Sequence, residues 1–173
     1  MKEIFRLLAE YTIQANHDMI RILEQIPLAK VTQDVGAYYK SILGILNHLL
    51  LSNIYWMGHL AKLIPELKPI LHELPNVQPK TPTDIIWDTL DSIKPALAGV
   101  DAQLKRLVQL LPEQKYVEGV KYASSKGGEQ TLIPWQVLLH LFNHQTHNRG
   151  QVAVLLDQFG VENDYSSILW RKY

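Results

Sequence analysis

Cysteine is absent from the 173 residues of this chain. Disulfide bonds, thiolate metal ligands and cysteine nucleophiles are therefore excluded, and any metal site has to be built from imidazole, carboxylate or amide groups. A chain without cysteine fits a reducing compartment, so we expect a cytoplasmic protein.

An excess of charge of either sign is also missing. Lysine plus arginine and aspartate plus glutamate number 17 each, so the formal net charge is zero, and no run of basic residues occurs. Nucleic-acid-binding domains usually show a basic face or a pI above about 9. We therefore expect no nucleic-acid partner.

Long apolar runs are lacking as well. Stretches such as Leu49–Leu51 are far shorter than the roughly 20 apolar residues that span a bilayer. Residues Met1–Phe5 mix acidic and basic side chains and do not resemble a signal peptide. We expect a soluble protein with no membrane partner.

Apolar residues make up 47% of the chain and charged residues 20%, which suits one globular domain over residues 1–173.

Apolar residues recur at helical spacing in four long segments. Pro27 follows the first segment and Gly160 follows the last, which are suitable stops. Ser41 and Thr83 are suitable N-caps for the second and third, and Pro95 predicts a kink or a break inside the third. The predicted helices cover residues 2–26, 41–63, 83–111 and 134–159.

A different pattern precedes the last helix. Residues 116–123 and 129–133 look extended and flank Ser124–Gly128, which ends in two glycines. This arrangement predicts a small hairpin, or otherwise a long loop. The chain as a whole is predicted to be all-α, a four-helix bundle with this insertion before its last helix.

The middle of the last predicted helix is unusually polar. The nine residues Asn143–Gln151 include no aliphatic or aromatic core side chain, although the helix is apolar on both sides of them. A helix turns once in about 3.6 residues, so this block covers every face, including the buried one. Unpaired burial costs about 1–3 kcal/mol per polar group, so these side chains need a metal, bound water or polar partners.

Histidine spacing within this helix favours a metal. His140, His144 and Asn148 are each four residues apart and stack along one side of the helix, while His147 lies three residues after His144. Two imidazoles one turn apart can share one ion at about 2.0–2.1 Å each.

The second predicted helix contains a complementary feature. His48 lies in an otherwise apolar run, and its neighbours on the same stripe are Gly44 and Ser52, both small. Small residues on either side leave room beside the imidazole for a ligand or substrate. A single buried histidine is more often a hydrogen-bonded core residue, but the histidines of the last helix raise the prospect of a shared metal site between facing helices.

Three segments resemble a known family, the DinB/YfiT-like metalloenzymes. Residues 140–151 are similar to its C-terminal signature, and residues 41–48 followed by Trp56 are similar to its second-helix signature. Residues 11–16 resemble the start of its first helix. The resemblance extends over nearly the whole chain. It implies an up-down-down-up bundle and a homodimer.

The resemblance also implies a histidine triad that holds nickel, zinc or a similar divalent ion. Its ligands correspond here to His48, His144 and position 148, where this chain has Asn148 in place of histidine. Asparagine is a poor ligand for such ions. The site is therefore expected to bind metal weakly through Asn148, to recruit His140 or His147 as the third ligand, to use water, or to be empty.

Two functions follow from the resemblance. Characterised relatives include thiol-dependent transferases, which implies a metal-dependent small-thiol S-transferase in which Arg149 and Gln151 orient a substrate or brace the ligands. Arg149 is equally expected as a structural ion-pair residue. The alternative is a non-catalytic dimeric bundle of the stress response with a weakened or empty metal site. No catalytic residue is identified from the sequence.

Overall fold

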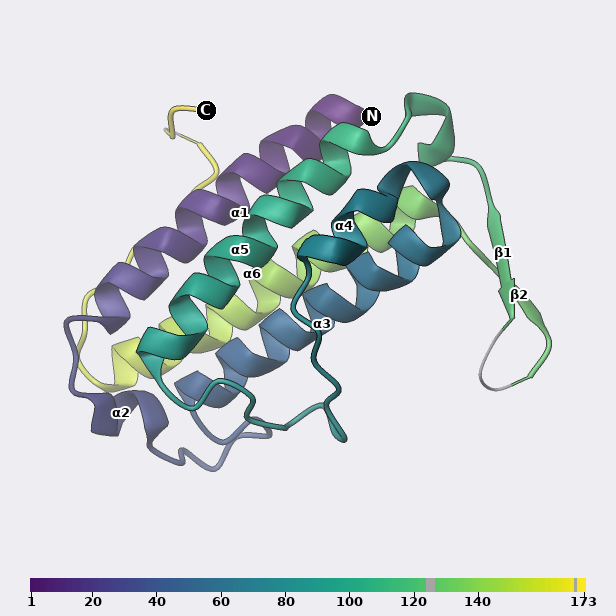
Figure 1. Cartoon of the computed structure of the whole chain (residues 1–173). Helices are drawn as coiled ribbons and strands as arrows, with labels where there is room; N and C mark the ends of the chain where they lie inside the picture. The colour runs from purple at the N-terminus through teal and green to yellow at the C-terminus, as the bar shows by residue number, and fades with distance from the viewer. Residues whose placement is uncertain (124–126, 170) are drawn as a thin grey trace.

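Four long helices form the body of the protein (Figure 1). The computed structural model describes residues 1–123, 127–169 and 171–173. Each of α1 and α3 packs against both α5 and α6, so the helices occupy the corners of a bundle. The chain runs in one direction along α1 and α6 and in the opposite direction along α3 and α5 (Figure 1). This up-down-down-up arrangement confirms the predicted all-α four-helix bundle. The long helices are α1 (Lys2–Leu23), α3 (Ile42–Leu63), α5 (Leu90–Leu110) and α6 (Pro134–Gln158).

Short elements connect the long helices. The predicted hairpin is confirmed as β1 and β2, which pair antiparallel with Val120 opposite Leu132 and project from one end of the bundle (Figure 1). Part of its expected turn, residues 124–126, lies outside the described residues. The short elements are α2 (Leu28–Thr32), η1 (Pro65–Leu67), α4 (Lys68–Glu73), η2 (Glu113–Tyr116), β1 (Val120–Ala123) and β2 (Glu129–Leu132).

The start of α3 follows the sequence prediction. The Ser41 hydroxyl accepts a hydrogen bond from the Gly44 amide at 3.1 Å, which satisfies one of the free amides of the first turn. Glycine is required at position 44 because a Cβ there would lie 1.9 Å from the carbonyl oxygen of Tyr39. The segment before α3 therefore runs directly against the helix.

The predicted start of the third long helix at Thr83 is wrong. The helix α5 begins at Leu90, where Thr89 and Ser92 form a reciprocal capping box. Asp84 instead accepts hydrogen bonds from the amides of Lys80 and Thr81 and closes a turn. Of the kink or break predicted at Pro95, the break is wrong, since α5 continues through this residue to Leu110. Pro95 has no backbone N–H, so α5 loses one hydrogen bond near its N-terminal end. The later turns of the helix remain intact.

The first helix is shorter than predicted. It ends at Leu23 with Glu24 as its C-cap, three residues before the predicted end at residue 26. Pro27 does not end α1 but serves as the N-cap of the short helix α2. Terminal turns fray easily, so boundaries are less well determined by sequence than the helices themselves.

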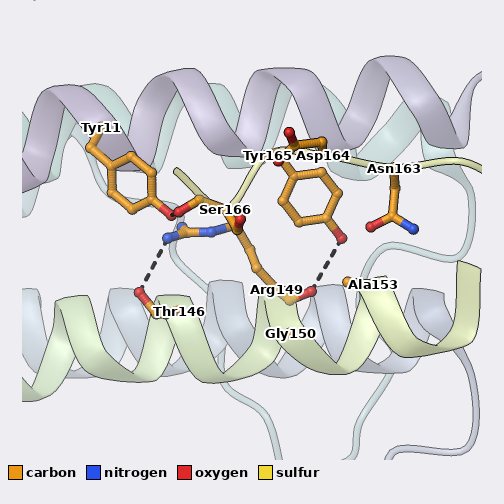
Figure 2. Close-up of a pocket in the computed structure, with 9 residues that line it drawn as sticks. All are labelled: Tyr11, Thr146, Arg149, Gly150, Ala153, Asn163, Asp164, Tyr165 and Ser166. Atoms are coloured by element: carbon orange, nitrogen blue, oxygen red, sulfur yellow. Dashed lines mark hydrogen bonds between the residues drawn. The ribbon is translucent and has the colours of Figure 1, made fainter. Parts of the chain in front are cut away.

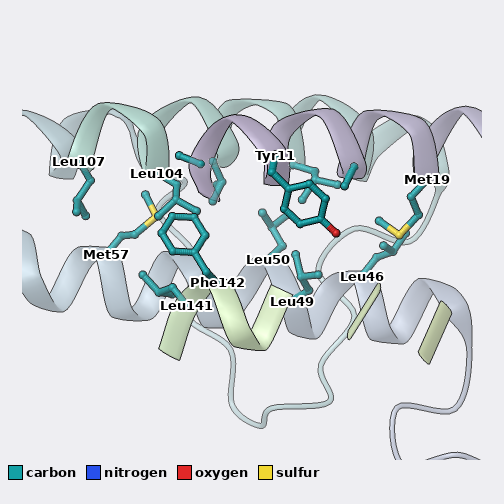
Figure 3. Close-up of a cluster of buried hydrophobic side chains, with 14 of the residues drawn as sticks. Tyr11, Met19, Leu46, Leu49, Leu50, Met57, Leu104, Leu107, Leu141 and Phe142 are labelled. Carbon is teal, nitrogen blue, oxygen red and sulfur yellow. The ribbon is translucent and has the colours of Figure 1, made fainter. Parts of the chain in front are cut away.

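Apolar side chains from all four long helices meet along the axis of the bundle (Figure 3). The helix α3 contributes on most of its circumference, as its apolar sequence predicts. Fully or nearly fully buried members of this core include Met19, Leu46, Leu49, Leu50, Met57, Leu104, Leu107, Leu141 and Phe142. No helix among the described residues is long and apolar enough to cross a membrane.

Asn47 fastens the loop that precedes α5 to α3. Its side chain is fully buried, at 0% exposure. The amide nitrogen donates to the carbonyl oxygens of Leu43 at 3.0 Å and Trp87 at 2.9 Å. The amide oxygen accepts from the backbone nitrogens of Ile86 at 2.9 Å and Trp87 at 3.0 Å. This bonding holds the 79–87 segment beside His48, the next residue of α3.

Replacement of Asn47 by alanine is expected to destabilise the protein by about 2–4 kcal/mol, because it leaves several backbone groups of the loop without partners. Urea denaturation measures this change. The matched control is Asn143→Ala on the exposed side of α6, for which a change of about 0.5 kcal/mol or less is expected. Equal effects of the two substitutions would contradict the role given to Asn47.

Candidate metal centre

The polar block of α6 is divided between two buried faces of the helix. His144 and Asn148 lie on the side of α3, where His144 meets His48. Gln145 and Arg149 lie on the side of α1, where both meet Asn16. The inward orientation of polar side chains that the sequence predicts is therefore present, and it forms two separate clusters.

His48 of α3 and His144 of α6 face each other across the groove between these helices. Their Nε2 atoms are 2.9 Å apart, and their ring centroids are 4.9 Å apart at 67°. Both side chains are half-buried. The structure thus brings together the two histidines that the sequence pointed to from positions 96 residues apart.

The hydrogen-bond partners of the two imidazole rings limit where their protons lie. Nδ1 of His48 lies 3.2 Å from the carbonyl oxygen of Pro82, which can only accept, so Nδ1 carries the proton and Nε2 does not. The Asn148 amide nitrogen donates to the backbone carbonyl oxygen of His144 at 2.8 Å and also lies 3.1 Å from its Nε2. The two Nε2 atoms share a hydrogen bond when His144 carries its proton on Nε2. Both present an electron pair to the same region when His144 carries its proton on Nδ1, an atom that has no hydrogen-bond partner among the described residues.

Burial lowers the pKa of both imidazoles. For His144 the loss of solvent is the main cause, followed by repulsion from His48, His140 and His147, and the pKa falls to about 4. For His48 burial lowers the pKa, against the opposing effect of its hydrogen bond to Pro82. Both rings are therefore neutral near pH 7, which is the form that binds metal ions.

The three residues predicted as a possible third ligand have other neighbours in this structure. Asn148 directs its amide nitrogen at His144, and its oxygen is buried without a hydrogen-bond partner among the described residues. The His140 ring stacks on that of His144 with centroids 5.8 Å apart, and His147 lies 2.8 Å from the Gln151 amide nitrogen. Within the described ranges no three His, Asp or Glu side chains are grouped so that they could hold one ion.

Among the described residues, the structure leaves a pocket beside His48 on the side of Ser52 and fills the side of Gly44. The gap predicted beside Gly44 is filled, because the Tyr39 backbone runs against this glycine and the Tyr39 ring stacks on His48 with centroids 4.1 Å apart. On the side of Ser52 a pocket of about 300 Å³ opens, bounded by Tyr55 and residues 79–82. Sequence reasoning missed Tyr39, since no pattern in the predicted loop marks it as a neighbour of His48.

The second cluster is a buried network that links α1, α5 and α6. The Asn16 amide nitrogen donates to Asp101 at 2.8 Å and to the Gln145 side-chain oxygen at 3.3 Å. Its oxygen accepts from Arg149 at 3.2 Å. Arg149 is 2% exposed and Asp101 is 3% exposed. The expectation that Arg149 orients a substrate at the histidines is not met, because its side chain packs on the other side of α6.

Asp101 was missed by sequence reasoning although a signal was present. It lies four residues after Leu97 and three before Leu104, on the apolar stripe of α5. Its complete burial raises the pKa of its carboxyl to about 7, while the Asn16 hydrogen bond and the Arg149 charge oppose the shift.

This shift predicts that stability decreases with rising pH. The folded protein holds the Asp101 proton up to a pKa of about 7, whereas the ordinary value is 3.8. The stabilisation is therefore complete below pH 3.8 and is lost as the pH rises through 7, with a slope of up to about 1.4 kcal/mol per pH unit.

Asp101→Asn should remove this contribution, because the amide does not titrate. Urea denaturation at about pH 5 and about pH 8 should show the variant gaining stability relative to the natural chain at the higher pH. A difference between the two proteins that is the same at both pH values would contradict a titrating Asp101.

The fold and the site together describe an all-α, up-down-down-up bundle with an imidazole pair between α3 and α6. The sequence matches the DinB family over residues 1–172, so the chain belongs to that family. A crystal structure of a DinB-like protein from Bacillus cereus has the same fold, with a TM-score of 0.54 and 18% sequence identity over 88% of this chain and 91% of that one. No curated protein gave a significant match.

Proposed function

We propose that this DinB-family protein binds a divalent metal ion through His48 and His144. The observation that carries the proposal is the separation of 2.9 Å between the two facing Nε2 atoms. Two nitrogen ligands at about 2.0–2.1 Å from one ion are about 2.9 Å apart at the right angle of square-planar or octahedral coordination, and about 3.3 Å apart at the tetrahedral angle usual for zinc. The two side chains are therefore already spaced as neighbouring ligands of a single ion.

Further features of the pair support this proposal. Neutral imidazole suits nickel and zinc, and burial keeps both rings neutral near pH 7. A divalent ion would replace the hydrogen bond between the two Nε2 atoms and be bound by both of them in their unprotonated form. The contact of His48 with the Pro82 carbonyl oxygen is the kind of outer hydrogen bond that fixes the orientation of a ligating histidine.

The activity that we propose for such a site is transfer of a group to or from a small thiol. A bound ion would stabilise the thiolate form, which is the nucleophile. The chain itself supplies two ligands and leaves positions open, since Asn148 presents a donor group to His144. The pocket beside Ser52 gives a small molecule access to His48. Assembly into a homodimer stays a prediction from the resemblance.

A non-catalytic role is the second candidate. The observation that favours it is the orientation of Asn148, whose amide nitrogen faces His144 where the family pattern has a third imidazole. In this case the two histidines form part of a polar cluster whose only effect is on the packing and stability of the bundle. Metal should then change neither the stability of the protein nor its spectroscopic properties.

Titration with nickel and with zinc distinguishes these functions. Calorimetry should show one ion per chain for the natural protein and at least about tenfold weaker binding after His48→Ala or His144→Ala, since each removes one of two ligands. Saturating metal, at about 100 times Kd, should stabilise the natural protein by about 2.7 kcal/mol. The control His17→Ala, in an exposed position of α1, should bind as the natural protein does. Absence of binding to either ion would overturn the metal proposal and support the non-catalytic role.

Asn148→His tests the geometry of the third position. The substitution places an imidazole one helical turn after His144, so it should strengthen binding by at least about tenfold, or about 1.4 kcal/mol. The matched control Asn143→His lies next to His144 in sequence but on the exposed side of α6 and should leave the affinity unchanged. Equal affinities of the two variants would show that position 148 does not reach the ion.

A further inference from the structure

A pocket lies between α1, α6 and the C-terminal segment, on the other side of α6 from the His48–His144 pair (Figure 2). Its volume is about 280 Å³. This is close to the lower end of the range of about 300–1,000 Å³ that is typical of small-molecule sites. The pocket therefore suits a ligand of few atoms.

The C-terminal segment is fixed over the pocket by hydrogen bonds. The Tyr11 hydroxyl donates to the carbonyl oxygen of Ser166 at 2.8 Å. The Tyr165 hydroxyl donates to the carbonyl oxygen of Arg149 at 3.1 Å (Figure 2). Further along, Arg171 pairs with Asp18 of α1 at 2.8 Å. These bonds join the tail to both helices, so the pocket is already formed without a ligand.

The lining of the pocket carries two opposite charges. The Arg149 guanidinium lies 5.0 Å from the centre of the Tyr11 ring and donates to the Thr146 hydroxyl at 3.3 Å, at one end of the pocket (Figure 2). Asp164 lies beside Tyr165, away from that end, and is exposed (Figure 2). Arg149 is only partly neutralised from within the protein, because burial raises the pKa of its neighbour Asp101 to about 7.

Gly150 of α6 contributes open space to the same pocket. A Cβ built at this position meets no atom within 4 Å, so packing does not require glycine there. Glycine in a helix costs about 1 kcal/mol relative to alanine. A glycine that destabilises the helix and is not needed for packing has the effect of enlarging the pocket beside Arg149.

We propose that this pocket binds a small zwitterion of the amino-acid type. The Arg149 guanidinium would hold the ligand carboxylate, and the Asp164 carboxylate would hold its ammonium group. The ligand side chain would lie against the rings of Tyr11 and Tyr165 and the methyl group of Ala153, which also line the pocket. The site is separate from the proposed metal centre and does not depend on it.

Calorimetric titration with free amino acids tests the proposal. Each amino acid that binds is compared with its analogue without the amino group and with its analogue without the carboxyl group. The analogue without the carboxyl group should bind at least about tenfold more weakly than the amino acid, because buried Arg149 loses its partner. The analogue without the amino group should bind up to about fivefold more weakly than the amino acid, because Asp164 is exposed and its ion pair is weak. Absence of binding by every amino acid at millimolar concentration would overturn the proposal, as would equal binding of both analogues.

Two glycine substitutions locate the binding site. Gly150→Leu should fill the pocket and weaken binding at least about tenfold. Gly99→Leu in α5 is the matched control, since a Cβ there also meets no atom within 4 Å and Gly99 does not line the pocket. Circular dichroism checks that both variants fold. If Gly150→Leu does not fold, the smaller substitution Gly150→Ala takes its place in the binding measurement. Unchanged binding by Gly150→Leu would overturn the placement of the ligand in this pocket.

Discussion

Burial of polar side chains in the middle of α6 is the constraint on which the remaining structure depends. The nine residues Asn143–Gln151 have no apolar core side chain, yet the helix lies in a bundle with an otherwise apolar core. Every inward-facing group at this level needs a partner, since an unpaired one costs about 1–3 kcal/mol. The bundle supplies partners separately on each buried side of the helix, and leaves the Asn148 oxygen, Nδ1 of His144 and the Gln145 amide nitrogen buried without a hydrogen-bond partner among the described residues.

On the side of α3 the partner is His48, and its surroundings are held by contacts at some distance from the imidazoles. Gly44 lets the Tyr39 backbone approach so that the Tyr39 ring stacks on His48. Asn47 binds the loop that brings the Pro82 carbonyl oxygen to the opposite nitrogen of His48. On the side of α1 the partners are Asn16 and Asp101, which surround Arg149 with polar atoms. One helix thus supports two chemically different clusters.

Much of the fold, and the level of the polar block in α6, could be predicted from the periodicity of the sequence. The long helices, the cap at Ser41 and the hairpin follow from local patterns, and the polar block marked the level of the bundle where unusual chemistry occurs. Thr83 is a suitable N-cap by its residue type alone, but Thr89 competes with a complete capping box. Asp101 was overlooked because its apolar neighbours Leu97 and Leu104 dominate the pattern. The DinB family assignment rested on motifs and is confirmed over residues 1–172.

The sequence by itself determined that α6 carries polar groups on its buried faces and that His48 lies on another central helix. Helical period is a local property, so these conclusions needed no contact between distant segments. Only the tertiary structure decided which groups meet. It separated Arg149 from the histidines, turned the amide nitrogen of Asn148 toward His144, and filled the space beside Gly44 with Tyr39. Those outcomes depend on side-chain rotamers and on the path of loops, which are set by packing between elements far apart in the chain.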